Sequence, residues 1–481
     1  MSQGTHIQAP AVLSSLAGIR SVYFVGIGGI GMSALARYFL SRGVAVSGYD
    51  KTETVLSRQL AAEGINITYK DDVSDVPPQV DLVVYTPAIP KEHAGLTYYR
   101  NNQFKIVKRS DVLQAISADS FNICIAGTHG KTTLTTMIAH ILRHSGYGCN
   151  AFLGGIAANY GTNFWSSSRG VCVIEADEYD RSFLKLSPDI AIITAMDADH
   201  LDIYGDEATM QQAFIDFAGK VKKGGLLLSR FGLQKLNAEP GEMQKSTYSL
   251  GNNAATVYAS NITIDEGGYT FNVHTAAEVI ESISLPMGGM HNVENMVGAV
   301  AVAKQLDIDA TSIKAAIKDF KGVKRRFEYI LPPQNKQQGA YTAPVLIDDY
   351  AHHPEELKAL LRSARTLFPQ RKITVIFQPH LYSRTRDFDK EFGRSLSLAD
   401  RIILLPIYGA REQPIEGVTS DLLLEAIDSA DKRLMEKAAL LAWTENYATK
   451  LDKEFGEVFI TAGAGDIDAL VQPLKDIIEK A

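Results

Sequence analysis

The sequence contains few cysteines and no long apolar run. Its three cysteines, Cys124, Cys149 and Cys172, lack the spacing of a metal site. Two of them lie in apolar stretches, so we expect buried thiols in a reducing cytoplasm. No segment reaches about 18 uninterrupted apolar residues, and the first residues lack the basic and apolar regions of a signal peptide. We therefore expect a cytoplasmic protein with neither a signal peptide nor a membrane span.

An excess of basic residues is also missing. The 48 Lys and Arg residues stand against 55 Asp and Glu, which gives a formal net charge of -7. A general nucleic-acid binder needs a basic face to neutralise phosphates, so we expect no nucleic-acid partner. The 46% hydrophobic and 21% charged residues are typical of a soluble globular protein, and 481 residues suffice for about three domains.

A third absence concerns one glycine. The stretch ICIAGTHGKTTLTTMIAHIL, Ile123 to Leu142, looks like a phosphate loop between a strand and a helix. The strict pattern G-x-x-x-x-G-K-[ST] requires glycine at position 125, where the chain has Ile125. A strand-turn-helix unit still points backbone N–H groups and a positive helix end at one place, and Lys131 adds a cation. We predict a phosphate site here, with Thr132 or Thr133 supplying a hydroxyl to Mg²⁺.

A second glycine-rich loop lies near the start of the chain. GIGGIG, Gly26 to Gly31, follows an apolar strand and precedes a helical stretch, and Asp50 ends the next strand. The pattern is typical of a dinucleotide site, most often for NAD. The loop itself demands only a diphosphate, so a UDP-type ligand fits as well. An NAD-dependent oxidoreductase stays open on this motif alone, although it leaves the phosphate loop without a role.

Acidic residues follow two apolar strands in the middle of the chain. These segments are VCVIEADEYD, Val171 to Asp180, and DIAIITAMDADHLD, Asp189 to Asp202. Such a density of charge after buried strands is costly unless a cation or a cationic substrate lies there. Together with the phosphate loop, the two clusters indicate a Mg²⁺-nucleotide site.

Two further motifs follow apolar strands in the last third of the chain. They are DDYAHHP, Asp348 to Pro354, and QPHLYSRTRD, Gln378 to Asp387. Their histidines and arginines could bind a carboxylate and move a proton, and helix capping with surface ion pairs is the alternative interpretation.

Alternating strands and helices predict an α/β fold throughout. The renewed strand-loop-helix pattern at Ile123 predicts a domain boundary near residues 115 to 121. The turn-rich stretch Leu331 to Pro344 predicts a second boundary, after which another doubly wound domain follows.

Taken together, these segments resemble the Mur ligase family along nearly the whole chain. The marks of the resemblance are FVGIGGIGMSALA, AGTHGKTT, IEADEYDRSF, DADHLDIYG, GMHNVENMVGA, GVKRRFE, DDYAHHP and FQPHLYSRTRD. The family's phosphate loop resembles G-T-x-G-K-[ST], so Gly127 begins the loop and Ile125 is expected. The resemblance implies a Rossmann-like UDP-sugar domain at residues 1–117, a central P-loop ATPase domain with a parallel sheet at 118–328, and a Rossmann-like amino-acid-binding domain at 329–481.

The resemblance is greatest to those members that add L-alanine to UDP-N-acetylmuramate. It implies an ATP-dependent ligase of peptidoglycan precursor synthesis, in which the lactyl carboxylate becomes an acyl phosphate and is then attacked by the amine. The implied cofactors are ATP and Mg²⁺, and the implied partners are UDP-N-acetylmuramate, L-alanine and ATP. We expect a monomer or weak homodimer.

The resemblance also implies roles for individual residues. The ATP-binding set is Gly127, Thr128, His129, Gly130, Lys131, Thr132, Thr133, Asn292, Asn295, Arg326 and Asp349. The UDP-sugar set is Gly28, Gly29, Ile30, Gly31, Asp50, Arg109 and Ser182. The amino-acid pocket is Tyr350, His352, His380 and Arg384, and the metal ligands are Thr132, Glu175 and His200. The catalytic set is Lys131, His200, Arg326, His352 and His380, and any of its three histidines could be the base that deprotonates the amine.

The sequence departs from the family pattern at two places. Leu381 follows the histidine of FQPH, where many relatives have a basic residue, so part of the contact to the alanine carboxylate has to come from elsewhere. The helical stretch TMQQAFIDFAGK has no lysine before Lys220, so we predict no carbamylated lysine.

The nearest rival is the recycling ligase of the same family, which adds a tripeptide to the same UDP-sugar. The stretches HLDIYG and EYDRSF favour the alanine-adding reaction. Folylpolyglutamate and cyanophycin-type ligases leave GIGGIG without a role as a UDP-sugar site. A non-enzymatic ATP-binding regulator predicts nucleotide binding without phosphate release.

Overall fold

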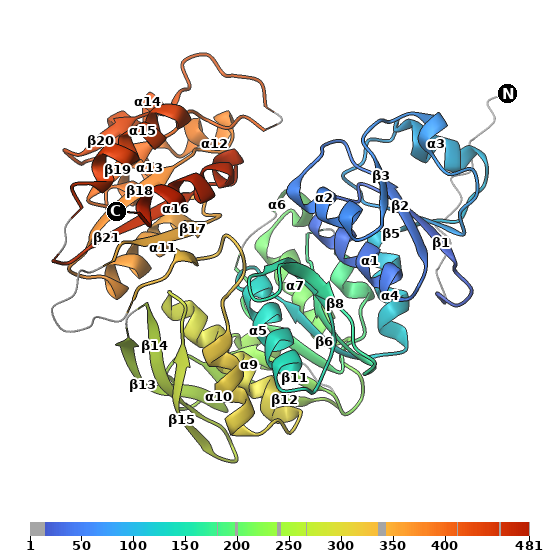
Figure 1. The fold of residues 1–481 in the computed structure, drawn as a ribbon. Helices are drawn as coiled ribbons and strands as arrows, with labels where there is room; N and C mark the ends of the chain where they lie inside the picture. Colours follow the sequence, from blue (N-terminus) through green and yellow to red (C-terminus); the bar gives the residue numbers. More distant parts are fainter. Residues whose placement is uncertain are drawn as a thin grey trace. The chain divides into compact units, whose positions relative to one another are not determined.

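The computed structural model describes residues 15–179, 181–197, 201–237, 242–265, 267–334, 343–410, 412–451 and 454–480. Within these ranges the chain forms three mostly parallel sheets with helices between the strands (Figure 1). This confirms the predicted α/β class. None of the helices in the described ranges is long and apolar enough to cross a membrane.

The first sheet is entirely parallel and has the strand order β3-β2-β1-β4-β5. Its strands are β1 (Ser21–Val25), β2 (Ala45–Tyr49), β3 (Asn66–Thr68), β4 (Leu82–Tyr85) and β5 (Ile106–Lys108). Its helices are α1 (Ile30–Ser41), α2 (Val55–Ala62), α3 (Ala94–Asn101) and α4 (Arg109–Ala118). The chain order reverses between β1 and β4, and ligands of doubly wound sheets bind beyond the carboxyl ends of strands at this kind of position. The glycine-rich loop follows β1 there.

The second sheet has the order β15-β14-β13-β12-β11-β10-β6-β9-β7-β8. Its first strands along the chain are β6 (Phe121–Ala126), β7 (Asn150–Ala157), β8 (Thr162–Trp165), β9 (Val171–Glu175) and β10 (Ile190–Ile193). Its later strands are β11 (Leu226–Arg230), β12 (Gln244–Ser249), β13 (Val257–Asp265), β14 (Gly268–His274) and β15 (Val279–Leu285). The helices of this part are α5 (Lys131–His144), α6 (Leu201–Tyr204), α7 (Glu207–Ala218), α8 (Gln234–Asn237), α9 (Met290–Gln305) and α10 (Ala310–Asp319). Because β6 pairs in parallel with both β9 and β10, the loops after these three strands meet at one edge.

The third sheet has the order β16-β17-β21-β18-β19-β20, in which only β16 runs antiparallel to its neighbour. Its strands are β16 (Glu328–Leu331), β17 (Val345–Asp349), β18 (Lys372–Phe377), β19 (Arg401–Leu404), β20 (Lys432–Leu434) and β21 (Glu457–Ala462). Its helices are α11 (Pro354–Leu367), α12 (Tyr382–Asp387), α13 (Asp389–Leu396), α14 (Ser420–Ala426), α15 (Lys437–Ala448) and α16 (Val471–Ile478). The motifs DDYAHHP and QPHLYSRTRD begin at or just after the carboxyl ends of β17 and β18, on either side of β21.

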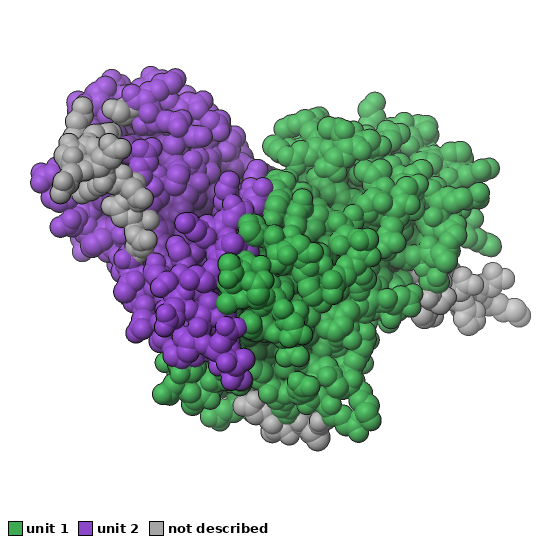
Figure 2. Space-filling view, turned by 60° about the horizontal axis from the view of Figure 1, so that its bottom comes forward, with its two compact units in different colours: residues 1–156, 160–258, 297–313 green, residues 157–159, 259–296, 314–481 purple. Residues whose placement is uncertain are grey.

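The chain divides into two compact units (Figure 2). The first contains residues 1–156, 160–258 and 297–313, and the second contains residues 157–159, 259–296 and 314–481. The first sheet and most of the second sheet therefore belong to one compact unit.

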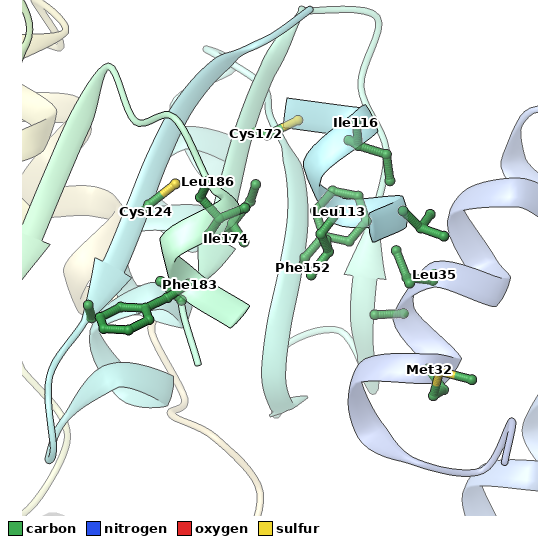
Figure 3. Close-up of a cluster of buried hydrophobic side chains, with 14 of the residues drawn as sticks. Met32, Leu35, Leu113, Ile116, Cys124, Phe152, Cys172, Ile174, Phe183 and Leu186 are labelled. Atoms are coloured by element: carbon green, nitrogen blue, oxygen red, sulfur yellow. The ribbon is translucent and has the colours of Figure 1, made fainter. Parts of the chain in front are cut away.

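A continuous apolar core explains why the first unit includes two sheets. Met32 and Leu35 of α1 lie in the same buried cluster as Leu113 of α4, Phe152 of β7 and Phe183 (Figure 3). These side chains come from elements on both sides of the expected boundary near residues 115 to 121. The apolar surface buried between these elements stabilises the packing of the first-sheet helices against the second sheet.

The three cysteines are all buried, as the sequence predicts. Cys124 and Cys172 belong to the same apolar cluster. Burial raises the pKa of the Cys149 thiol to about 12, so this group stays protonated and unreactive at neutral pH.

A set of buried polar side chains also connects helix α1 of the first sheet to strand β8 of the second sheet. Asn163 on β8 is fully buried and donates from its amide nitrogen to the carbonyl of Ile30 and to the hydroxyl of Ser33. Its amide oxygen accepts a hydrogen bond from Arg37, which also forms an ion pair with Glu63. The buried guanidinium of Arg37 therefore has a hydrogen-bond acceptor on β8, in Asn163, and another at the end of α2, in Glu63.

We expect Asn163→Ala to lower the stability of the first unit by about 2–4 kcal/mol, because the buried Arg37 loses an acceptor and the Ile30 carbonyl loses its side-chain donor. Urea denaturation followed by tryptophan fluorescence measures this, since Trp165 lies on the same strand. Asn102→Ala is the matched control, because Asn102 is exposed and its amide makes one local bond to the Tyr98 carbonyl. Equal midpoints for the two variants would contradict a role for these buried polar side chains.

Candidate active site

The predicted phosphate loop lies between β6 and α5. Gly127 has φ +135°, and a Cβ atom there would lie 2.1 Å from the Thr194 hydroxyl oxygen. Gly130 has φ +80° and caps α5, which begins at Lys131. Position 125, where the strict motif demands glycine, lies inside β6 and is fully buried. The local geometry thus requires glycine at Gly127 and tolerates isoleucine two residues earlier.

The end of β10 braces this loop from one side. The Thr194 hydroxyl donates to the carbonyl of His129, and the Thr128 N–H donates to the carbonyl of Ala195 at 3.2 Å. The Asp197 N–H donates to the Thr128 hydroxyl at 3.3 Å. The side chain of His129 points outward and is 71% exposed. These bonds fix the loop before any ligand binds, which reduces the ordering cost of binding.

Lys131 is held at the mouth of the loop by two acceptors. Its Nζ donates to Glu178 Oε1 at 2.6 Å and to the Gly127 carbonyl at 2.6 Å. Glu178 is 1% exposed, and this burial raises the pKa of its carboxyl while the Lys131 ammonium opposes the shift. The ion pair keeps the ammonium close to the N-terminus of α5, where a phosphate group is also attracted.

Thr132 and Glu175 come together on the other side of the helix start. The Thr132 hydroxyl donates to Glu175 Oε1 at 3.0 Å, and the Gly154 N–H donates to Glu175 Oε2 at 3.0 Å. A hydroxyl and a carboxylate are hard oxygen ligands of the kind that Mg²⁺ prefers, and Mg²⁺ commonly keeps several waters besides one or two carboxylates. The two predicted ligands therefore fit a magnesium ion.

The third predicted ligand, His200, lies outside the described residues. Among the residues that are described, no group of three or more His, Cys, Asp or Glu side chains is arranged to hold a metal ion. Thr133 is also buried, in the first turn of α5.

The glycine-rich loop after β1 is braced by Asp50. Gly28 N–H donates to Asp50 Oδ2 at 2.8 Å, while Oδ1 accepts from the Thr52 N–H at 3.2 Å. Gly29 is the N-cap of α1, and Ile30 begins the helix. A side chain at Gly28 would press on the Asp50 carboxylate, since its Cβ would lie 2.8 Å from Oδ2. The carboxylate therefore serves the loop backbone.

Arg109 links this loop to the middle of the chain. A Cβ atom on Gly31 would lie 3.0 Å from Arg109 Nη1, and Arg109 Nη2 lies 3.4 Å from Asp177 Oδ2. The Ser182 hydroxyl donates to the Asp177 carbonyl at 3.2 Å. Within the first unit, the predicted UDP-sugar residues Gly31, Arg109 and Ser182 thus converge on the segment that carries Glu175 and Glu178.

The remaining predicted ATP residues belong to the second unit. Asn292 and Asn295 are both buried in the first turns of α9. Asn292 Nδ2 donates to the Gly288 carbonyl at 2.7 Å, and Asn295 Nδ2 lies 3.4 Å from Asn292 Oδ1.

Asp349, at the end of β17, accepts backbone hydrogen bonds from Phe327 and Ala351, both at 2.7 Å. Burial raises the pKa of its carboxyl to about 6, while these two N–H groups and Arg326 oppose the shift. Arg326 itself is exposed. Asp349 thereby ties the segment that carries Arg326 to the third sheet.

Arg325, the residue before Arg326, contacts a carboxylate, a backbone carbonyl and an aromatic ring. Its Nε lies 3.4 Å from Asp348 Oδ2, its Nη2 donates to the Gly463 carbonyl, and its guanidinium lies 5.0 Å from the ring centroid of Tyr350. Asp348 is buried, which raises the pKa of its carboxyl to about 7 against the opposing charge of Arg325. Arg325 therefore anchors the segment in which Arg326 lies.

The four predicted amino-acid residues gather at the carboxyl edge of the third sheet. The rings of Tyr350 and His352 lie 5.2 Å apart, and those of His352 and His380 lie 5.8 Å apart. Arg384 Nη1 donates to the His352 carbonyl at 3.4 Å. Tyr408 stacks on His380 with centroids 5.9 Å apart. Burial lowers the pKa of both histidines, which favours neutral imidazoles at neutral pH.

Several residues at these sites are not singled out by the sequence. Gly154 and Tyr408 come from β7 and from the segment after β19, far from the recognised motifs. Glu178 and Asp177 lie inside one, but the cluster contains four acids and only the fold shows which way each points. Arg325 is the first of two adjacent arginines, and the sequence singles out the second.

The chain matches three family models in order. Residues 21–121 match "Mur ligase family, catalytic domain", residues 125–303 match "Mur ligase middle domain", and residues 325–465 match "Mur ligase, glutamate ligase domain".

Several known proteins are similar to this chain over nearly the full length of both chains. The UDP-N-acetylmuramate–L-alanine ligase of Cytophaga hutchinsonii is 45% identical, with 97% of this chain and 98% of the relative covered. The ligase of the same name from Porphyromonas gingivalis is 43% identical, over 96% and 99% of the two chains. The solved UDP-N-acetylmuramate-alanine ligase of Thermotoga maritima has a TM-score of 0.75 at 28% identity, over 96% and 98%. A murein peptide ligase of Psychrobacter arcticus, at 22% identity and a TM-score of 0.66 over 96% and 99%, shares the fold.

Gly154→Ala tests the predicted magnesium site without changing a predicted ligand. The new Cβ would lie 2.2 Å from the Glu175 carboxylate oxygens, so that side chain has to move away from Thr132. We expect the Mg²⁺ concentration for half-maximal activity to rise by about 10- to 100-fold. A titration of activity with Mg²⁺ measures this, with Gly170→Ala as control because a Cβ there meets nothing within 4 Å. An unchanged Mg²⁺ requirement would remove Glu175 from the metal site.

Proposed function

The chain belongs to the Mur ligase family, and we propose that it joins L-alanine to the lactyl carboxylate of UDP-N-acetylmuramate, with ATP converted to ADP and phosphate. The family is ATP-dependent, and amide formation of this kind serves peptidoglycan precursor synthesis. The observation that carries the proposal is the similarity to L-alanine-adding relatives along 97% of the chain, since it includes the third sheet with its cluster of histidines and Arg384. The functional division we propose is 1–117 for the UDP-sugar, 118–328 for ATP and 329–481 for the amino acid.

The first chemical step uses the edge of the second sheet. A carboxylate is a poor acyl donor, so it first takes the terminal phosphoryl group of ATP. Lys131 and the N–H groups at the start of α5 face the phosphates and stabilise the charge that accumulates in this transfer. Arg326, which is exposed and close to Asp349, is proposed as a further contact of the phosphates.

A magnesium ion would be held by the Thr132 hydroxyl and the Glu175 carboxylate, and would neutralise charge on the phosphates. His200 is proposed as a further ligand. Gly154 keeps Glu175 in place through its N–H, so the carboxylate needs no rearrangement to meet a cation.

The second step takes place at the edge of the third sheet. Arg384 is suited to bind the amino-acid carboxylate, because a guanidinium presents paired donors to it. Tyr350, His352 and His380 line the same place and provide a neutral nitrogen base. The reaction belongs in the cytoplasm, where ATP and UDP-sugars are available.

The alternative of an NAD-dependent oxidoreductase accounts only for the glycine-rich loop and Asp50. It leaves the phosphate loop and the Thr132–Glu175 pair without a role, and the N–H groups bound by Asp50 fit either ligand, because each carboxylate oxygen keeps a further lone pair. The Gly26 to Gly31 loop is proposed to hold the diphosphate of the UDP-sugar instead.

Acceptor dependence tests the function directly. We expect phosphate release from Mg-ATP to require both UDP-N-acetylmuramate and L-alanine. Glycine should be less efficient by about 10-fold or more, because one missing methyl group removes about 1–3 kcal/mol of discrimination. L-serine and the tripeptide L-Ala-γ-D-Glu-diaminopimelate complete the comparison in a coupled phosphate assay. Preference for the tripeptide would move the chain to the recycling reaction, and no release with any acceptor would leave only a nucleotide-binding protein.

Lys131→Met should lower kcat/KM for ATP by about 10²-fold or more, because the phosphoryl transfer loses its nearest cation. The variant also leaves the buried Glu178 without the Lys131 ammonium, which costs stability. The double variant Lys131→Met/Glu178→Gln removes that charge and should regain stability in thermal denaturation while staying inactive. Recovery of activity in the double variant would show that Lys131 acts on folding alone.

A further inference from the structure

His352 has one ring nitrogen fixed by two acceptors. Its Nδ1 lies 2.9 Å from the carbonyl oxygen of Tyr350 and 3.3 Å from Glu356 Oε2. A carbonyl and a carboxylate only accept, so Nδ1 carries the hydrogen in the neutral ring. Nε2 then carries the lone pair and is the nitrogen that can take up a proton.

Glu356 is itself held in position. Its Oε2 accepts from the backbone N–H of His352 at 2.9 Å and of His353 at 3.1 Å. Glu356 lies in the first turn of α11, where these bonds also close a capping box around His353. The carboxylate is 52% exposed, yet two backbone donors hold the oxygen that faces the imidazole.

The other described histidine of the pocket lacks such an arrangement. His380 Nδ1 is buried and has no hydrogen-bond partner among the described residues. Its ring is positioned by stacking on Tyr408, which fixes the plane of the ring but does not select a tautomer. His200 lies outside the described residues. The geometry therefore distinguishes His352 from His380, which the sequence does not.

The charged and titratable groups around His352 are Glu356, Arg384, His353 and His380, and the aromatic ring of Tyr350 packs against it. Burial lowers the pKa of His352, and Arg384 and His353 act in the same direction, while Glu356 and the hydrogen bond to the Tyr350 carbonyl raise it. The imidazole is therefore neutral at neutral pH, and Glu356 stabilises the imidazolium that forms when Nε2 takes up a proton.

We propose that His352 is the base that deprotonates the amino-acid substrate and that Glu356 is the positioning residue that fixes its tautomer and supports its charge. This rests on the proposed function, which places the amine at this edge of the third sheet. An N–H bond of the substrate ammonium breaks, its electron pair stays on the amine nitrogen, and the proton forms a bond to Nε2. The amine is then able to attack the acyl phosphate, and the positive charge on His352 faces Glu356.

Glu356→Gln separates the electrostatic role from the structural one. The amide oxygen of glutamine can still accept the N–H groups of His352 and His353, so the cap on α11 is kept while the charge is lost. Glu355→Gln is the matched control, because Glu355 is its neighbour on the same helix, is 74% exposed and pairs with Lys358.

We expect Glu356→Gln to lower the pKa of His352, because the carboxylate charge that stabilises the imidazolium is lost. In the pH profile of kcat/KM for L-alanine, the acidic limb should therefore move to lower pH. Glu355→Gln should move neither. His352→Gln should lower kcat by about 10²- to 10⁴-fold with little change in the KM for ATP. The full-length enzyme labelled in its histidines reports the pKa and the Nδ1–H tautomer by NMR, and His352→Gln assigns the signal.

The inference is overturned if the acidic limb is unmoved in Glu356→Gln, if the His352 signal shows the Nε2–H tautomer, or if His380→Gln alone abolishes the limb. The NMR titration does not depend on turnover. An enzyme that uses another acceptor in place of L-alanine would remove the proposed substrate but not this inference, because the same limb is then followed with that acceptor.

Discussion

The position of β6 between β9 and β10 is the constraint on which the active site depends. All three strands are parallel, so their carboxyl ends deliver the phosphate loop, the Glu175 cluster and the Thr194 brace to one edge. The contact between Gly127 and Thr194 then leaves no space for a side chain at the first loop position. The glycine spacing that departs from the strict motif is thus a consequence of how closely β10 approaches the loop.

The same edge concentrates carboxylates, and two of them are bound by specific donors. Glu175 accepts from the Thr132 hydroxyl and the Gly154 N–H, while Glu178 accepts from Lys131. The third sheet repeats this arrangement at Asp349, which accepts from two backbone N–H groups. Hydrogen bonds to charged groups contribute about 1.5–3 kcal/mol each, which offsets the desolvation of carboxylates placed at strand ends.

Much of the fold follows from local patterns in the sequence. Apolar runs mark the buried strands: β9 (Val171–Glu175) and β10 (Ile190–Ile193) lie in the two stretches whose acidic ends the sequence singles out. Glycine loops and the start of α5 at Lys131 are equally local, because turn geometry and helix capping act over a few residues. The α/β class could therefore be predicted from sequence.

Other features depend on contacts between distant segments, which no local pattern records. Gly154 supports Glu175 from a different strand, and Asn163 satisfies Arg37 across the two layers of the first unit. The choice between Glu175 and Glu178, three positions apart in one acidic stretch, is made by the direction of each side chain after β9. The packing of two sheets into one unit is likewise invisible in the alternation of strands and helices.

The shared core of the first unit has a consequence for the energetics of the reaction. The glycine-rich loop at Gly28, which we propose for the UDP-sugar, and the loop at Gly127, which we propose for the ATP phosphates, belong to one packed unit, joined by buried apolar side chains and by the Arg37–Asn163 bond. Their separation is set when the chain folds. Because folding already aligns the two loops, the chain loses no further conformational entropy to align them in each catalytic cycle, and the entropy lost per cycle is that of binding the substrates.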